Sequence, residues 1–209
     1  MAADSSTVAL IVDLQVDFFA HERLTRHRAV LADRTNALTA AARLACVPVV
    51  WIKQQFAQDL SDAPLEFKKT GRRVVIAGTP GASLLPELKV TASDRILVKK
   101  RYSAFFATGL DDLLTQLGCT QLIVAGINTH ACVRSSVVDA YQRDYDILLA
   151  RDCIDSHDEQ HHEISWRYMD GRLGRGMSNE GIIAALQSEL KSVVPRRLAH
   201  FVRAPLEFC

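Results

Sequence analysis

The sequence lacks several features that would place it outside the ordinary soluble globular proteins. No apolar run approaches the roughly 18 residues that a membrane-spanning helix needs. The small, polar start at Met1–Ser6 has no basic region ahead of an apolar stretch, so we expect no secretory signal and a cytoplasmic location. An excess of one charge is also missing, because 25 Lys and Arg face 24 Asp and Glu. We therefore expect neither a nucleic-acid nor a membrane partner.

Closely spaced cysteine pairs are missing as well. The cysteines are odd in number and widely separated, so they form neither a zinc-binding pattern nor a redox pair. In a reducing compartment we expect them to be free thiols. Most are then small core residues, and only one or two need a chemical explanation. The five are Cys46, Cys119, Cys132, Cys153 and Cys209.

What the sequence does contain is enough apolar material for one packed core. With 209 residues, of which 48% are hydrophobic and 23% charged, it has the size and composition of a single globular domain. We expect that domain over residues 1–194. An irregular tail over 195–209 follows, with two prolines and several basic and aromatic residues, and it is a candidate contact with a neighbouring subunit.

Short runs rich in Val and Ile alternate with longer segments of helical period. This alternation predicts an α/β fold with three α/β/α layers and a mostly parallel central sheet. The runs are continuously apolar, as in strands covered on both faces. The predicted strands are Thr7–Asp13, Val47–Lys53, Arg95–Lys99, Gln121–Gly126 and Asp146–Ala150, with a weaker one at Arg73–Ile76. The predicted helices are Arg28–Leu44, Leu110–Leu117, Cys132–Arg143, His161–Tyr168 and Glu180–Leu190.

Three residues with reactive side chains stand where predicted strands end. Asp13 closes the first strand, Lys99 closes the Arg95–Lys99 strand, and Cys132 follows a strand by a short loop as a helix begins. Ligands of open parallel sheets bind outside the carboxyl ends of the strands, so the three are candidates for one site. A cysteine at a helix N-terminus near a lysine is expected to have a lowered pKa. A carboxylate within reach takes the thiol proton and returns it to a leaving amine.

Residue types and spacing alone leave the function open. A cysteine at a helix start is commonly a small packing residue, an aspartate after a strand commonly caps the next helix, and a lysine at a strand end commonly meets solvent. Two further clusters have plain interpretations. The basic residues Lys68, Lys69, Arg72 and Arg73 indicate a solvated face, and the histidine-rich segment His157–His162 indicates a polar helix opening.

Four motifs in order resemble the isochorismatase-like cysteine hydrolases. Residues 9–18 are similar to the family's first strand with its Asp-x-Gln-x-Asp-Phe signature, and residues 78–88 resemble its central loop. Residues 99–105 carry Lys-x-Arg-Tyr-Ser-Ala-Phe, and the most specific block, 124–134, contains Cys132. Four ordered matches are implausible as coincidence, and the chain is identified as a member of this family.

The resemblance implies a cysteine amidohydrolase with a catalytic triad. Cys132 would attack a carbonyl carbon, Asp13 would act as general base and then as acid, and Lys99 would stabilise the thiolate and orient the pair. The Lys-x-Arg-Tyr spacing selects Lys99, and the neighbouring Lys100 is expected to point to the opposite side of the strand.

The resemblance also implies an oxyanion hole and a set of substrate contacts. A cis peptide bond between Ile127 and Asn128 would aim the Asn128 amide, together with that of Cys132, at the developing oxyanion. Aromatic side chains would wall the pocket, and an arginine would meet a substrate carboxylate. Each candidate contact also fits core packing or a solvated helix surface. The candidates near the motifs are Gln15, Phe18, Tyr102, Phe105, Asn128, His130 and Arg134.

Within the family, the presence of Cys132 favours hydrolysis of a C–N bond. The substrate would be a small amide, ureide or carbamoyl compound, cleaved through a thioester with release of ammonia. One alternative is an isochorismatase, which hydrolyses a vinyl ether to pyruvate and a dihydroxybenzoate precursor and does not require the cysteine. Another, of a different class, is a non-catalytic thiol sensor or scaffold.

Two further expectations concern metals and assembly. Nicotinamidase relatives bind a metal through an Asp-x-His element after the second strand, whereas this sequence has Ser61 two residues after Asp59. We therefore expect no metal and no cofactor, with His21, His27 and His130 as isolated packing or surface residues. The resemblance implies a homo-oligomer, either a dimer or a tetramer.

Overall fold

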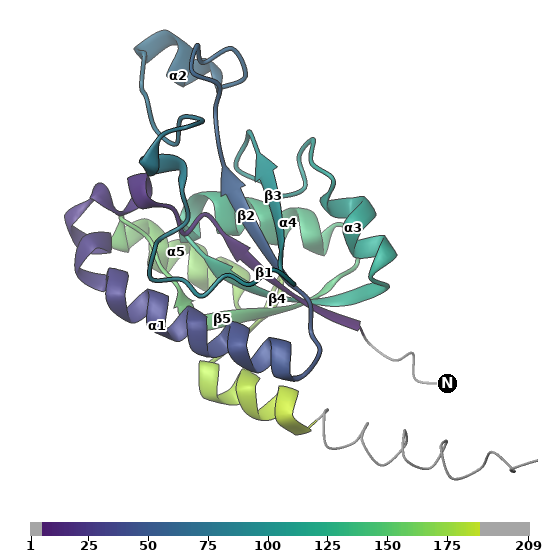
Figure 1. The fold of residues 1–209 in the computed structure, drawn as a ribbon. Coiled ribbons are helices and arrows are strands. Elements are labelled where there is room, and N and C mark those ends of the chain that lie inside the picture. Colours follow the sequence, from purple (N-terminus) through teal and green to yellow (C-terminus); the bar gives the residue numbers. More distant parts are fainter. Residues whose placement is uncertain (1–5, 189–209) are drawn as a thin grey trace, which may run out of the picture.

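A computed structural model describes residues 6–188 of the chain (Figure 1). Six strands form one sheet, every neighbouring pair is parallel, and their order is β3-β2-β1-β4-β5-β6. The first strand, β1, lies in the middle of the sheet. The next two strands, β2 and β3, extend the sheet on one side of β1, and β4, β5 and β6 extend it on the other. The strands are β1 (Ser6–Val12), β2 (Val49–Gln54), β3 (Arg95–Lys99), β4 (Cys119–Gly126), β5 (Asp146–Ile154) and β6 (Arg175–Met177).

Helices cover both faces of the sheet, which confirms the three-layer α/β/α prediction. The α-helices are α1 (Glu22–Leu44), α2 (Leu65–Thr70), α3 (Leu110–Gln116), α4 (Arg134–Tyr141) and α5 (Glu159–Met169). Three short helical turns are η1 (Val16–Ala20), η2 (Pro80–Ala82) and η3 (Thr129–Val133), and residues 179–188 are also helical. Between residues 6 and 188, no helix combines the length and the hydropathy that a bilayer crossing requires.

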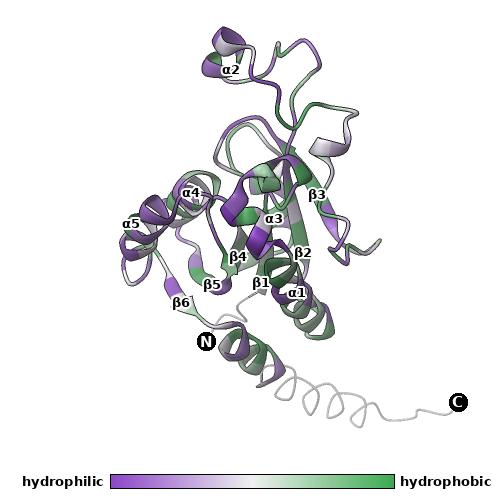
Figure 2. Ribbon diagram, turned by 90° about the vertical axis from the view of Figure 1, so that its left-hand side faces the viewer, coloured by the Kyte–Doolittle hydropathy of each residue, from purple (hydrophilic) through white to green (hydrophobic). Residues whose placement is uncertain are grey.

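Alternating strand residues divide the core between the two faces, because successive side chains of a strand point to opposite sides. Ile11 and Trp51 pack with α1 and the 179–188 helix, whereas Leu10 and Ile52 pack with α3, α4 and α5. The mostly hydrophobic strands therefore run through the centre of the molecule, between the helices (Figure 2). Burial on both faces explains why β1 and β2 are continuously apolar in sequence, whereas in the edge strand β3 Ile96 and Val98 are exposed.

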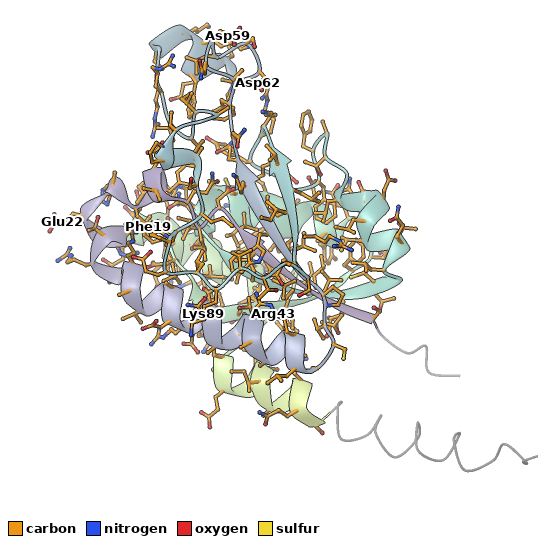
Figure 3. All side chains as sticks on the ribbon, viewed as in Figure 1. Phe19, Glu22, Arg43, Asp59, Asp62 and Lys89 are labelled. Carbon is orange, nitrogen blue, oxygen red and sulfur yellow. The ribbon has the colours of Figure 1, made fainter. Side chains whose placement is uncertain are left out.

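A long excursion over residues 55–94 joins β2 to β3 and carries α2 away from the sheet (Figure 1). Asp59 and Asp62 lie at its far end (Figure 3). A small apolar cluster of its own, which includes Phe56, Leu60 and Ile76, stabilises the excursion. It stands over the edge of the sheet where β1 and β2 end, and it forms one wall of the hollow described below.

The predicted strand at Arg73–Ile76 is wrong. Its apolar residues pack in the cluster of the excursion, Ile76 makes only an isolated bridge to Phe56, and the Val75 amide donates to the Asp17 carboxylate at 2.7 Å. A side chain therefore takes the place of a strand partner. The prediction also missed β6 and α2, and α1 begins at Glu22 rather than Arg28. The predicted tail and the end of the Glu180–Leu190 helix lie outside the described residues.

Candidate active site

Asp13, Lys99 and Cys132 meet at the carboxyl edge of the sheet. The Lys99 Nζ atom lies 2.6 Å from Asp13 Oδ2 and 3.3 Å from Cys132 Sγ. The same ammonium group donates to the Arg101 carbonyl at 3.0 Å. The side chains of Asp13 and Lys99 are both 0% exposed, so this is an ion pair removed from water. The sequence predicted these residues as one site, and the fold brings them into contact.

Local backbone geometry aims each of the three groups. Asp13 follows β1 with a φ of +55°, a left-handed conformation that aspartate tolerates better than most residues. Its amide donates to the Ile52 carbonyl at 2.9 Å, which fixes it beside β2. Lys99 is the last residue of β3, and Lys100 turns away from the site to pair with Asp62 at 2.7 Å.

Cys132 lies in the π-helical turn η3, ahead of α4, rather than in the first turn of an α-helix. We call residues 126–132 the nucleophile turn. The peptide bond between Ile127 and Asn128 is cis, at the position where the family resemblance places one. The amides of Ala131 and Val133 both donate to the Asn128 carbonyl, at 3.0 and 3.2 Å, so the turn is held by its own backbone.

The electrostatics of the site correct the expectation of a lowered thiol pKa. Burial raises the pKa of Cys132, the negative charge of Asp13 raises it further, and Lys99 offsets only part of the rise. Burial also raises the pKa of Asp13 against the opposing charge of Lys99. Burial lowers the pKa of Lys99, but the negative partners outweigh it and the net pKa is raised. The resting site therefore holds a thiol beside a carboxylate and an ammonium ion.

The Asp13 carboxylate can accept a further hydrogen bond, even though the Lys99 ammonium group is close to it. Among the described residues, neither carboxylate oxygen receives a hydrogen bond of good angular geometry. The contact with Lys99 is therefore mainly Coulombic attraction. A buried carboxylate with a raised pKa and an unused lone pair has the properties of a proton acceptor.

A hollow of about 480 Å³ opens above Cys132. Its walls come from the η1 region, the end of β2, the excursion that carries α2, the segment after β3, the nucleophile turn and the loop after β5. Asp13 and Lys99 lie behind the cysteine and do not line it. The lining residues are Asp17, Phe18, Ala20, His21, Gln54, Glu66, Phe67, Arg72, Val74, Tyr102, Asn128, His130, Ala131, Cys132 and His157.

Four of the substrate-facing candidates, Phe18, Tyr102, Asn128 and His130, line the hollow. The other three, Gln15, Phe105 and Arg134, lie elsewhere, and we do not propose them as substrate contacts.

Each of these three side chains is committed to a partner in the fold. Gln15 is fully buried, donates to the Gln54 and Ala82 carbonyls and accepts from the Gln54 amide. Phe105 stacks on Tyr145 in the core. The Arg134 guanidinium lies 4.6 Å from the centre of the Tyr168 ring.

Several lining residues were not predicted from the sequence. His21 and His157 belong to a row of rings with His130, with ring centres 5.4 Å apart for His21 and His157 and 5.1 Å apart for His130 and His157. Burial, with the neighbouring imidazoles, lowers the pKa of His130 and His157, which favours neutral rings. The histidines therefore gather instead of standing isolated. Only the density of histidine in the sequence signalled them.

The basic cluster was correctly predicted to be exposed, but Arg72 also lines the hollow, with its guanidinium 5.2 Å from the centre of the Phe67 ring. From residue 6 to residue 188, no three His, Cys, Asp or Glu side chains are grouped so that they would hold a metal ion.

An all-parallel α/β sheet with a buried Cys–Asp–Lys cluster at its carboxyl edge defines a class of hydrolase, and a comparison with known families agrees. Residues 7–180 match the family model described as the Isochorismatase domain. The chain belongs to the isochorismatase family and is a hydrolase enzyme.

Individual relatives span different amounts of the chain. A protein of Arabidopsis thaliana named a probable inactive nicotinamidase is 32% identical, over 67% of this chain and 75% of its own length. Maleamate amidohydrolase of Pseudomonas putida is 29% identical, over 54% of this chain and 53% of that enzyme. The crystal structure of an isochorismatase family protein from Desulfovibrio vulgaris has a TM-score of 0.77 and 26% identity, covering 88% of this chain and 100% of that one.

Proposed function

We propose that this enzyme hydrolyses a C–N bond of a small amide, ureide or carbamoyl compound through a thioester on Cys132, with release of ammonia. The observation that carries the proposal is the Lys99 ammonium group in contact with both Asp13 and Cys132 beneath the hollow. These are a nucleophile, a base and a charge that holds them together. The similarity to maleamate amidohydrolase supports amide cleavage.

In the acylation step, the Cys132 thiol passes its proton to the Asp13 carboxylate as Sγ bonds to the substrate carbonyl carbon. The carbonyl π electrons move to oxygen and form an oxyanion. When the tetrahedral intermediate collapses, the C–N bond breaks and Asp13 gives the proton to the departing nitrogen. Ammonia leaves, and a thioester remains on Cys132. Lys99 keeps its proton throughout, so a positive charge stays beside the sulfur.

The oxyanion is assigned to the backbone amides of Asn128 and Cys132. Within the described part of the chain, the Asn128 amide donates no hydrogen bond to another residue, and Asn128 lines the hollow beside Cys132. A donor without a partner at that position is available to a developing negative charge. Donors of this kind lower the barrier by roughly 3 kcal/mol each.

Deacylation reverses the roles with water as the nucleophile. Asp13, again a carboxylate, accepts a proton from water as the oxygen attacks the thioester carbon. The C–S bond breaks, the acid product leaves, and the thiolate regains its proton from Asp13. The site returns to a thiol, a carboxylate and an ammonium ion.

The test is a panel of small amides and ureides assayed for ammonia release. We expect Cys132→Ala and Asp13→Asn each to lower the rate by roughly a thousandfold or more, with melting temperatures close to that of the wild type. The matched control is Cys46→Ala, since Cys46 is an exposed free thiol and its loss should leave the rate unchanged. An active Cys132→Ala protein would overturn the proposal.

An assay with isochorismate distinguishes amide cleavage from the vinyl ether hydrolysis of an isochorismatase. Pyruvate release that persists in Cys132→Ala would assign vinyl ether hydrolysis in place of amide cleavage. Pyruvate release by neither protein, together with ammonia release by the wild type alone, is the result expected here.

A further inference from the structure

We infer that Asp155 is a positioning residue that fixes the nucleophile turn by tying it to α1; this inference rests on the proposed function. Asp155 directly follows β5, and its side chain is 12% exposed. It neither contacts Cys132 nor lines the hollow above it. Any influence on the reaction must therefore pass through the residues that it holds.

The loop of residues 155–157 is bonded to four residues of the nucleophile turn. The Asp155 amide donates to the Gly126 carbonyl at 3.3 Å, and its carbonyl accepts from the Thr129 amide at 3.0 Å. One residue on, the Ser156 hydroxyl lies 2.7 Å from His130 Nδ1. The His157 amide then donates to Asn128 Oδ1 at 3.0 Å. The geometry of the turn therefore depends on where this loop lies.

The carboxylate of Asp155 holds the loop from its other side. Arg23 of α1 donates to it through a short contact, and His27, one turn further along the same helix, places Nδ1 2.7 Å from its second oxygen. Arg23 also donates to the Ser156 carbonyl. Burial opposes ionisation of Asp155, but the hydrogen bonds from Arg23 and His27 outweigh it and lower its pKa. An ionised carboxylate thus links α1 to the loop, and the loop to the nucleophile turn.

This chain of contacts ends on the groups that the transition state needs. Asn128 supplies the proposed oxyanion donor, and His130 walls the hollow. A shift of the loop would move the amide donor relative to the sulfur but would leave most of the substrate-binding wall in place. Misplacement of a catalytic group by about 1 Å lowers a rate by roughly a hundredfold. Loss of the Asp155 charge should therefore lower kcat more than it raises KM.

The chain offers a matched control in the ion pair of Arg43 and Asp94. Arg43 is also on α1, near its C-terminal end and beside the Lys89 carbonyl to which it donates (Figure 3). Its Nη2 atom lies 2.6 Å from Asp94 Oδ2, and the Asp94 side chain is 1% exposed. This pair ties the same helix to a different loop, and neither of its residues lines the hollow above Cys132.

The experiment compares Asp155→Asn with Asp94→Asn in the full chain. For each we would measure the melting temperature, kcat and KM for ammonia release, and inhibition by the aldehyde analogue of the amide used. Addition of the Cys132 thiol to that aldehyde gives an adduct whose oxygen occupies the proposed oxyanion position. We expect both variants to melt below the wild type. Asp155→Asn should lower kcat by about tenfold, change KM by less than about twofold, and weaken aldehyde inhibition by about tenfold; Asp94→Asn should leave all three within about twofold.

Equal kcat values in the two variants would overturn the positioning role and would leave the proposed function intact, because that rests on Cys132→Ala. If Asp155→Asn does not fold, Arg23→Met replaces it, since methionine keeps much of the side-chain bulk but lacks the Nη1 atom that donates to both Asp155 and Ser156. The same split between kcat and KM is expected, and its absence overturns the inference.

Discussion

At Cys132, burial and the neighbouring Asp13 carboxylate both disfavour the thiolate, and the Lys99 ammonium group compensates only in part. In the proposed mechanism the thiolate therefore forms only as Asp13 takes its proton, while Sγ bonds to the substrate. A free thiolate near neutral pH is the form that oxidants and alkylating agents attack. Because Cys132 rests as a thiol, it is protected from these reagents. The lowered pKa expected for a cysteine at a helix start would instead have favoured the thiolate.

A variant without the Asp13 charge tests this effect on the pKa of Cys132. In Asp13→Asn the negative charge beside the thiol is gone and Lys99 remains, so the pKa of Cys132 should fall. We expect alkylation of Cys132 by iodoacetamide at neutral pH to become at least several-fold faster than in the wild type, although ammonia release is lost. Peptide mass spectrometry distinguishes Cys132 from the other thiols. An alkylation rate that stays the same or falls would contradict the charge assignment, and Asp94→Asn should show no change.

The lowered pKa of Asp94 leads to a prediction about how stability depends on pH. Burial raises its pKa, but hydrogen bonds from Arg43, the Thr91 amide and Trp51 outweigh that and lower the pKa to about 2. Because the folded pKa lies below the unfolded one, the stabilisation is complete above about pH 4 and is lost as the pH falls towards 2. A difference of this size corresponds to about 2 kcal/mol. The wild type and Asp94→Asn should therefore differ less in their free energy of unfolding, measured by urea denaturation, as the pH falls from 4 to 2. A difference that does not change with pH would contradict the prediction.

Asp13, Lys99 and Cys132 were candidates because each follows a predicted strand at the carboxyl edge of the sheet, and the family resemblance joined them into one predicted triad. The residues that line the hollow could be predicted only in part. Gln15 and Arg134 belong to the motifs in sequence, yet their partners, Ala82 and Tyr168, come from segments that the sequence does not place. Arg72 shows the converse, since the excursion folds an exposed residue over the hollow.

At the scale of elements, the nucleophile turn depends on a close approach between β4 and β1. Gly126 has a φ of +126°, and a Cβ atom there would lie 2.0 Å from the Val12 carbonyl oxygen. We expect Gly126→Ala to lower the free energy of unfolding by more than about 4 kcal/mol or to prevent folding. Gly109 has open space around it and an ordinary φ of −84°, so Gly109→Ala should change stability by less than about 1 kcal/mol. Urea denaturation measures both, and similar stabilities would contradict the steric argument.

Most of the longer elements were predicted where they lie, although α1 begins earlier than expected, and the short edge strand β3 was predicted with its exact bounds. β1 and β4 are buried on both faces and α1 has a continuous apolar side, so local sequence and tertiary packing agree. β6 contains three residues and α2 six, too few for a period to emerge. The misassigned run at Arg73–Ile76 is apolar for a different reason, since it packs in the cluster of the excursion.

At the scale of the whole molecule, the single-domain prediction remains to be tested. Trp51 and Cys153 belong to the core on the α1 side of the sheet, whereas Cys132 belongs to the core on the opposite side. Because both cores share the same strands, we expect them to unfold together. Alkylation of Cys153 and of Cys132, one in each core, should therefore give the same urea midpoint. Separate midpoints would divide the chain into two units.

The strand order also sets when the site exists during synthesis. β1 pairs with β2 on one side, and β3 joins β2, so the ends that carry Asp13 and Lys99 are complete once residue 99 has been made. Cys132 arrives with β4, which pairs with the other side of β1, with Val12 opposite Gly126. A growing chain thus contains Asp13 and Lys99 before it contains Cys132. Cys132 reaches Asp13 only after β4 has joined β1, so the three groups of the proposed site come together last.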